Sequence, residues 1–282
     1  MIAPDYSTDS RYRLSEAQLR NFERDSFLNL GQLFTLDEMN AVVAAFDNLL
    51  SAPSQNIDVI KEGSSAGTRS VMGWENEDPV LAHFSRDARV LGAVQSVIGE
   101  EVVFHQTKYN PKAPNGVGEK WDPHRGITFW HYLDGVPEPQ RIVSIFIAVT
   151  DQTEANGATY TWTGAHNMDL EELKQETDFN SRQDSEMSGD TAAYLSLQIK
   201  PEKIEEYNRR FEQTYFAGPA GTVWLLDSRN LHASQPNLSD KTRILVANVY
   251  RSIENYPRHP RPSEILCNTS ATPLCAREGR FA

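Results

Sequence analysis

Two histidines in this chain have neighbours that suit a chemical role. His124 lies in the run WDPHRGITFW at residues 121–130, and His232 lies in NLHASQPN at residues 230–237, with Arg243 eleven positions later. Histidine is a common metal ligand, so the pair is a candidate metal site built from two distant segments. The alternative is that both are ordinary structural histidines and that Arg243 is an ordinary strand arginine. No Ser-His-Asp or Cys-His motif supports nucleophilic catalysis.

These segments resemble the phytanoyl-CoA dioxygenase superfamily of iron(II)/2-oxoglutarate oxygenases, and within it the ectoine hydroxylases. The similarity covers residues 14–252 and extends to HQTKYN at 105–110, WH at 130–131, DG at 134–135, TD at 150–151, NG at 156–157 and TGAH at 163–166. It implies a double-stranded β-helix (jelly-roll) with iron(II) at one open end, bound by His124 and His232. It also implies 2-oxoglutarate as a cofactor, O2 as the co-substrate, and Arg243 as the partner of the distal 2-oxoglutarate carboxylate.

The first histidine motif departs from the hydroxylases at one position. They carry His-x-Asp or His-x-Glu, whereas this chain carries His124-Arg125-Gly126. Side chains two apart in a strand point to the same side, so we expect His124 and position 126 to face the metal together. Gly126 then leaves one coordination position vacant, where a small anion such as chloride could restore the charge of the missing carboxylate.

That glycine resembles the signature of the iron(II)/2-oxoglutarate halogenases. The resemblance implies a chlorinase of an unactivated aliphatic C–H bond in specialised metabolism, with chloride as a cofactor and Gly126 as the halide site. Two alternatives stay open for Gly126. The chain is a hydroxylase of the ectoine type in which water or another acid such as Asp122 fills the gap, or it has lost its metal or was altered here. A non-catalytic jelly-roll binding protein is the alternative outside the enzymes.

Further site residues follow from the same resemblance. Lys108, Asn110 and Ser144 are expected to contact 2-oxoglutarate with Arg243, and Gln106, Arg125, Trp130 and His131 are expected to contact the substrate. Residues 106, 108 and 110 alternate along a predicted strand and share one face, which is either the cavity or a solvent-facing polar edge. Ser144 is equally well a packed core hydroxyl, and residues 130–131 part of a buried aromatic cluster.

The patterns of the chain predict helices first and strands afterwards. Apolar residues at helical spacing predict helices that begin near Leu14 and Thr35 and a third over 79–99. Short β-branched and aromatic runs predict strands at 102–110, 142–150, 158–163, 193–199, 222–227 and 243–252. We therefore expect a mainly β protein in which N-terminal helices cover a jelly-roll. Its single domain would comprise a helical part (1–100), a jelly-roll core (101–252) and a C-terminal extension (253–282), with a polar excursion at 169–190.

The composition of the chain excludes some classes of partner. The formal charge of −12 argues against binding to a nucleic-acid polymer, which relies on Lys and Arg. No apolar stretch approaches the roughly 20 residues that span a bilayer, and the first residues lack a signal-peptide core. With only Cys267 and Cys275, a reducing cytoplasm is the expected location. The oligomeric state stays open.

Five cations are expected around the mouth of the site and favour an anionic small molecule as the substrate. They are Lys108, Lys112, Lys120, Arg125 and Arg229. A deoxynucleoside monophosphate, its base stacked on Trp130 or Tyr132, is the first hypothesis. Free amino acids and alkaloid-like products are open alternatives, and the same cations could simply bind 2-oxoglutarate or form surface pairs.

Overall fold

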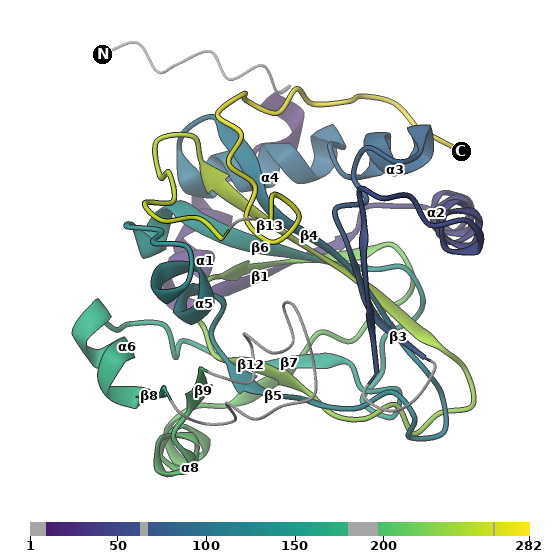
Figure 1. The fold of residues 1–282 in the computed structure, drawn as a ribbon. Coiled ribbons are helices and arrows are strands. Elements are labelled where there is room, and N and C mark those ends of the chain that lie inside the picture. Colours follow the sequence, from purple (N-terminus) through teal and green to yellow (C-terminus); the bar gives the residue numbers. More distant parts are fainter. Residues whose placement is uncertain (1–9, 63–66, 180–196, 262) are drawn as a thin grey trace.

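The computed structural model describes residues 10–62, 67–179, 197–261 and 263–282, and two antiparallel sheets that face each other form its centre (Figure 1). The large sheet has the order β1 (Phe27–Gln32), β11 (Thr222–Asp227), β6 (Ile142–Ala148), β13 (Arg243–Ser252), β4 (Val102–Lys112), β3 (Thr68–Met72) and β2 (Asp58–Lys61). The small sheet has the order β10 (Gln213–Tyr215), β7 (Thr159–Trp162), β12 (His232–Ser234) and β5 (Trp121–His124). The expected mainly β jelly-roll with N-terminal helices is confirmed.

N-terminal helices cover the outer face of the large sheet (Figure 1). They are α1 (Glu16–Asp25), α2 (Leu36–Ser51), α3 (Pro79–Phe84) and α4 (Ala88–Ile98), preceded by the short η1 (Ser10–Tyr12). Fully buried side chains such as Phe46, Leu91 and Val246 form the hydrophobic core between these helices and the sheet. Burial of this apolar surface fixes which face of the sheet remains for a site.

Alternation along the strands of the large sheet separates this core from the interior between the sheets. Ile244 and Val246 of β13 pack toward the helices, whereas Arg243, Leu245 and Ala247 line the cavity between the sheets. The same alternation in β4 directs Tyr109 into the helix-covered core and the neighbouring Lys108 into the cavity. Strand periodicity therefore sets which residues can reach a ligand.

The first hundred residues differ from the predicted helical part in two ways. The helix expected over 79–99 is divided, because Asp78 and Asp87 each cap a new helix: their Oδ1 atoms accept from Val80 N at 2.7 Å and from Arg89 N at 3.0 Å. In addition, β1, β2 and β3 belong to the large sheet, so the sheet does not begin at residue 101. These strands are only four to six residues long, which is too short for a clear period-2 signal.

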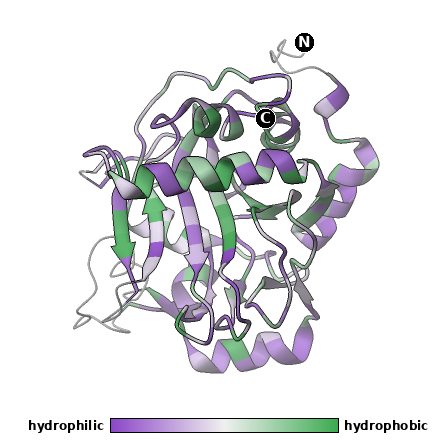
Figure 2. Cartoon of the chain, turned by 90° about the vertical axis from the view of Figure 1, so that its right-hand side faces the viewer, coloured by the Kyte–Doolittle hydropathy of each residue, from purple (hydrophilic) through white to green (hydrophobic). Residues whose placement is uncertain are grey.

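The remaining elements connect and flank the sheets. They are α5 (Gly126–Tyr132), η2 (Pro139–Arg141), α6 (Leu170–Glu176), β8 (Thr177–Asp178), β9 (Gln198–Ile199) and the hydrophilic α8 (Pro201–Arg210), which lies at the bottom of Figure 2. The predicted strand 193–199 and polar excursion 169–190 lie partly outside the described residues. No helix in the described ranges is long and apolar enough to cross a membrane. The described part of 253–282 forms loops that pack over one end of the large sheet, drawn in yellow in Figure 1.

Candidate active site

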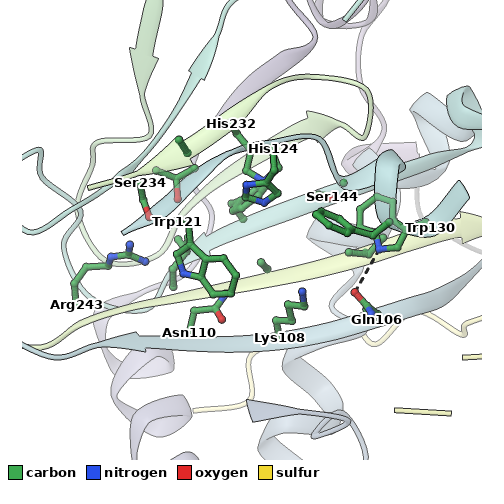
Figure 3. Close-up of a pocket in the computed structure, with 18 residues that line it drawn as sticks. Gln106, Lys108, Asn110, Trp121, His124, Trp130, Ser144, His232, Ser234 and Arg243 are labelled. Carbon is green, nitrogen blue, oxygen red and sulfur yellow. Dashed lines mark hydrogen bonds between the residues drawn. The ribbon is translucent and has the colours of Figure 1, made fainter. Parts of the chain in front are cut away.

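Paired strands bring the two predicted metal ligands together. His124 ends β5, and its register partner on β12 is His232. The ring centroids lie 4.2 Å apart, and both rings line a pocket between the two sheets (Figure 3). Residues 108 positions apart in the sequence thus become neighbours because β5 and β12 pair antiparallel.

The hydrogen bonds of both rings fix the tautomer. Nδ1 of His124 donates to the carbonyl of Asp122 at 2.7 Å, and Nδ1 of His232 lies 3.4 Å from the carbonyl of Asn230. A carbonyl can only accept, so the proton resides on Nδ1. Desolvation and the neighbouring His124 lower the pKa of His232 well below its ordinary value. A neutral imidazole that carries its proton on Nδ1 has its lone pair on Nε2, which is the form that binds a metal.

Arg243 brings a positive charge to the same pocket. Arg243 is 2% exposed, and its described hydrogen bond is from an Nη atom to the carbonyl of Gly157, at 2.6 Å. Burial lowers the pKa of Arg243 to about 10. Among the described residues no carboxylate pairs with it, and its Nε has no hydrogen-bond partner. Such a buried, unpaired cation is suited to an anionic ligand.

Ser234 lies beside Arg243 and was not among the predicted site residues (Figure 3). It is two residues after His232 on β12, so strand alternation places both side chains on the cavity face. Its Oγ accepts a hydrogen bond from Lys112 Nζ at 2.7 Å, and Lys112 also donates to the carbonyl of Gln235 at 2.6 Å. The alternation from His232 was the signal that could have identified this hydroxyl.

The predicted polar face of β4 does line the pocket. Gln106, Lys108 and Asn110 face it together, and Ser144 lines it from β6, two strands away in the same sheet (Figure 3). Ser70 Oγ of β3 donates to Asn110 Oδ1 at 2.8 Å, which holds the amide in place. Their assignment to 2-oxoglutarate or substrate stays a prediction.

Gly126 lines the pocket, but its surroundings differ from the predicted strand face with an open position beside His124. β5 ends at His124 and α5 begins at Gly126, so the two residues do not share a strand face. A Cβ built on Gly126 would lie 2.4 Å from Cη2 of Trp130, one helical turn later. The indole therefore covers the position that a carboxylate side chain would take. None of the described lining residues is an aspartate or glutamate.

Two predicted substrate contacts do not line the pocket. Arg125 points the other way, where its Nε donates to Glu176 at 2.6 Å and its guanidinium lies 4.9 Å from the ring centre of Tyr207. His131 bonds through Nδ1 with the carbonyl of Val136 at 2.9 Å. The helix α5 turns successive side chains by about 100°, which separates His131 from its neighbour Trp130. Trp130 does line the pocket.

The expected group of cations at the mouth is also not formed. Arg125 pairs with Glu176, Arg229 with Asp227 at 2.6 Å, and Lys120 with Asp122 at 2.7 Å. The last pair also occupies the Asp122 carboxylate, which is not among the lining residues and so offers no replacement ligand. Of the five predicted cations, Lys108 lines the pocket.

Aromatic side chains that are not among the predicted site residues complete the walls. Phe129 and Phe146 line the pocket, and Trp121 lies near Asn110 (Figure 3). The guanidinium of Arg69 stacks on Trp121 at 3.9 Å from the ring centre and is itself paired with Glu62. Aromatic residues near a motif do not reveal from the sequence whether they face a cavity or the core.

Fold and site together define a jelly-roll protein with a two-histidine pocket and a buried arginine for an anionic ligand. The chain belongs to the phytanoyl-CoA dioxygenase (PhyH) family, whose model matches residues 22–245.

Comparison with characterised proteins gives a more specific likeness. The chain is 30% identical over 263 residues to ectoine dioxygenase of Bordetella parapertussis, covering 89% of this chain and 82% of that one. It is 26% identical over 265 residues to L-proline trans-4-hydroxylase of Streptomyces griseoviridis, covering 93% and 95%. The crystal structure of EctD from S. alaskensis with 2-oxoglutarate and 5-hydroxyectoine matches with a TM-score of 0.79 at 23% identity, over 100% of this chain and 93% of that one.

These relatives overturn the predicted function. They are ectoine dioxygenases and a proline hydroxylase, which supports hydroxylation and not the expected chlorination, and none of their names points to a nucleotide. The hypothesis also assumed an open position beside Gly126, whereas the Trp130 indole covers it. The alternative interpretation of the sequence, a hydroxylase of the ectoine type, agrees with the activities for which these relatives are named.

Proposed function

We propose that this protein is an iron(II)/2-oxoglutarate-dependent hydroxylase of an aliphatic carbon in a small polar molecule. The observation that carries the assignment is the buried Arg243, without a carboxylate partner among the described residues, in the same pocket as two imidazoles. The relatives, which are named for oxidation of ectoine and proline, support it. A cytoplasmic location is part of the same hypothesis.

The residues present fit both cofactors. His124 and His232 would hold iron(II) through their Nε2 atoms, because each Nδ1 is turned to a carbonyl. Arg243 and Ser234 would hold the distal carboxylate of 2-oxoglutarate, with a guanidinium and a hydroxyl side by side (Figure 3). Bound together, iron and 2-oxoglutarate supply the O2-dependent oxidising chemistry of this class.

The protein's own contribution is binding, orientation and exclusion of water. The carbonyls of Asp122 and Asn230 orient the two imidazoles. The carbonyl of Gly157 accepts one hydrogen bond from Arg243 and leaves the rest of the guanidinium for the ligand. Phe129, Phe146 and Trp130 give the pocket apolar walls, which limit water near the reacting carbon. Lys108 also lines the pocket and would orient a polar or anionic substrate.

Gly126 supplies no carboxylate, so the iron would need a small ligand from solution. Water, placed where the Trp130 indole leaves room, would fill this role. Hydroxylation has a direct readout in the product. With iron(II), O2, 2-oxoglutarate and a panel of ectoine, proline and anionic analogues, we expect a mass increase of one oxygen atom, with or without chloride. A chlorinated product in chloride buffer would contradict hydroxylation.

The role of Arg243 can be tested without knowing the substrate. Arg243→Gln should weaken 2-oxoglutarate binding by about tenfold or more, because charge-assisted hydrogen bonds are lost. The measurement is an anaerobic titration of the iron(II) protein, followed by the visible band that 2-oxoglutarate gives on chelating iron(II). Arg258→Gln, at an exposed position outside the pocket, is the matched control. Equal affinity in both variants would exclude Arg243 as the anchor, and a parent protein without the band would instead support a non-catalytic binding protein.

A further inference from the structure

The C-terminal segment, defined here as residues 257–261 and 263–268, contacts residues of β4 that line the candidate active site. Leu266 offers its carbonyl to Gln106 Nε2, and Arg261 donates to the same carbonyl at 3.0 Å. Asn268 N donates to the carbonyl of His105 at 3.0 Å, so the segment runs along β4. Gln106 is thereby held from outside the two sheets by a part of the chain that carries no motif.

Arg261 also binds Asp134, which lies two residues after the end of α5. Its Nε donates to Asp134 Oδ1 at 2.6 Å and an Nη donates to Oδ2 at 3.0 Å. Asp134 has no exposed surface and also bonds with His105 Nε2 at 3.1 Å. Although burial alone would raise the pKa of Asp134, the hydrogen bonds from His105 and Arg261 keep it below its ordinary value. The carboxylate is therefore ionised and fully engaged.

This cluster does not form a metal site. His105, Asp134 and Cys267 have the proximity of metal ligands. However, burial raises the pKa of Cys267 to about 12, and Arg261 already neutralises Asp134. A cation would have to displace that guanidinium and deprotonate the thiol. The cluster is instead a buried polar connection between the C-terminal segment, β4 and α5.

From Gln106 the connection continues to Gly126. Gln106 Oε1 accepts a hydrogen bond of 3.4 Å from Trp130 Nε1, drawn as the dashed line in Figure 3. The ring of His105 meets the edge of the same indole, at 5.6 Å between centroids. The indole in turn covers Gly126, next to His124. An uninterrupted series of contacts therefore leads from Arg261 to the position beside the histidines.

We propose that Arg261 is a positioning residue, which holds the Trp130 indole over Gly126 through the carbonyl of Leu266, Gln106 and the Asp134 end of α5. The C-terminal segment thus determines how much space is open beside the histidines. The effect of Arg261 on turnover rests on the proposed function, whereas its effect on the position of Trp130 does not.

The position of Trp130 can be measured in the metal-free protein. The parent protein and each variant are compared with the same protein carrying Trp130→Phe. The difference in fluorescence isolates the Trp130 indole from the other four tryptophans. In Arg261→Gln we expect acrylamide to quench the Trp130 component about fivefold more strongly. The loss of one net hydrogen bond shifts the equilibrium between the covered and the exposed indole by about this factor. Arg258→Gln is the matched control, because it lies in the same segment with an exposed side chain outside this series.

A second variant separates positioning from a general loss of stability. Gln106→Leu removes the bond to Trp130 but leaves the pair between Arg261 and Asp134, so it should expose Trp130 without detaching the segment. Unchanged quenching in both folded variants would overturn the inference. In the active enzyme, Arg261→Gln should consume more 2-oxoglutarate per product formed. If quenching changes but no variant consumes 2-oxoglutarate, the proposed function fails and the positioning role stands.

Discussion

Gly126 and Trp130 together determine what can stand beside His124. A side chain at position 126 would meet the far edge of the indole, and that indole is 5% exposed and bonded to Gln106. An added ligand at position 126 therefore competes with a packed ring. The glycine is as much a packing requirement of Trp130 as a missing carboxylate.

The expected result of Gly126→Asp is a less stable protein, by about 1–3 kcal/mol, because the added group overpacks against Trp130. Denaturant unfolding measures this cost. Adding Trp130→Ala should make room for the carboxylate and raise the affinity for iron(II), which anaerobic titration measures. The matched control is Gly126→Asn with Trp130→Ala, which has the space but no charge. If Gly126→Asp alone binds iron more tightly without loss of stability, the indole does not occupy this position.

At the scale of elements, the turn before β7 supports the anionic end of the site. Gly157 has φ +75°, a left-handed conformation that favours glycine, and its carbonyl accepts from Arg243. A Cβ built there would lie 2.3 Å from the carbonyl oxygen of Gln235, which is backbone and cannot turn away. The turn and the strand β12 thus approach each other closely behind Arg243.

Gly157→Ala should therefore cost about 1–3 kcal/mol of stability and weaken 2-oxoglutarate binding, because the turn must move away from Arg243. Gly99→Ala is the matched control: Gly99 has φ +76° but no atom within 4 Å of an added Cβ. It should carry only the conformational cost, about 1 kcal/mol, with normal 2-oxoglutarate affinity. Equal effects in the two variants would show that the close approach to Gln235 has no influence on Arg243.

At the scale of the whole molecule, a buried amine links stability to pH. Lys112 is 4% exposed, and burial together with the charges of Arg243 and Arg69 lowers its pKa to about 6. The unfolded chain has the ordinary value near 10.5, so above about pH 6 the unfolded state binds more protons than the folded state. The contribution of Lys112 to stability therefore increases as the pH rises through this window.

We expect the free energy of unfolding of the parent protein to rise from about pH 7 to about pH 9 more steeply than that of Lys112→Met, by up to about 1.4 kcal/mol per pH unit. Urea unfolding at several pH values measures both slopes. Lys120→Met, at an exposed lysine paired with Asp122, is the control and should keep the parent slope. A parent slope retained in Lys112→Met would show that Lys112 is protonated in the folded protein.

Residue types and their spacing were sufficient for much of this molecule. Alternation along 106–110 predicted which side chains share a face, because the period of a strand is local geometry. The pairing of His124 with His232, and the place of Arg243 beside them, followed from the family resemblance of those motifs. The runs at 222–227 and 243–252 match β11 and β13.

The tertiary structure decided what surrounds those residues. Arg125 turned to Glu176 and away from the pocket because α5 begins at once after β5. Ser234 entered the site, while three of the five expected cations formed ion pairs elsewhere. Gly126 in the sequence marks an absent carboxylate, but what fills its place depends on Trp130, Gln106 and Leu266, from three separate segments. Such long-range contacts depend on how helices and sheets pack, which local sequence patterns do not determine.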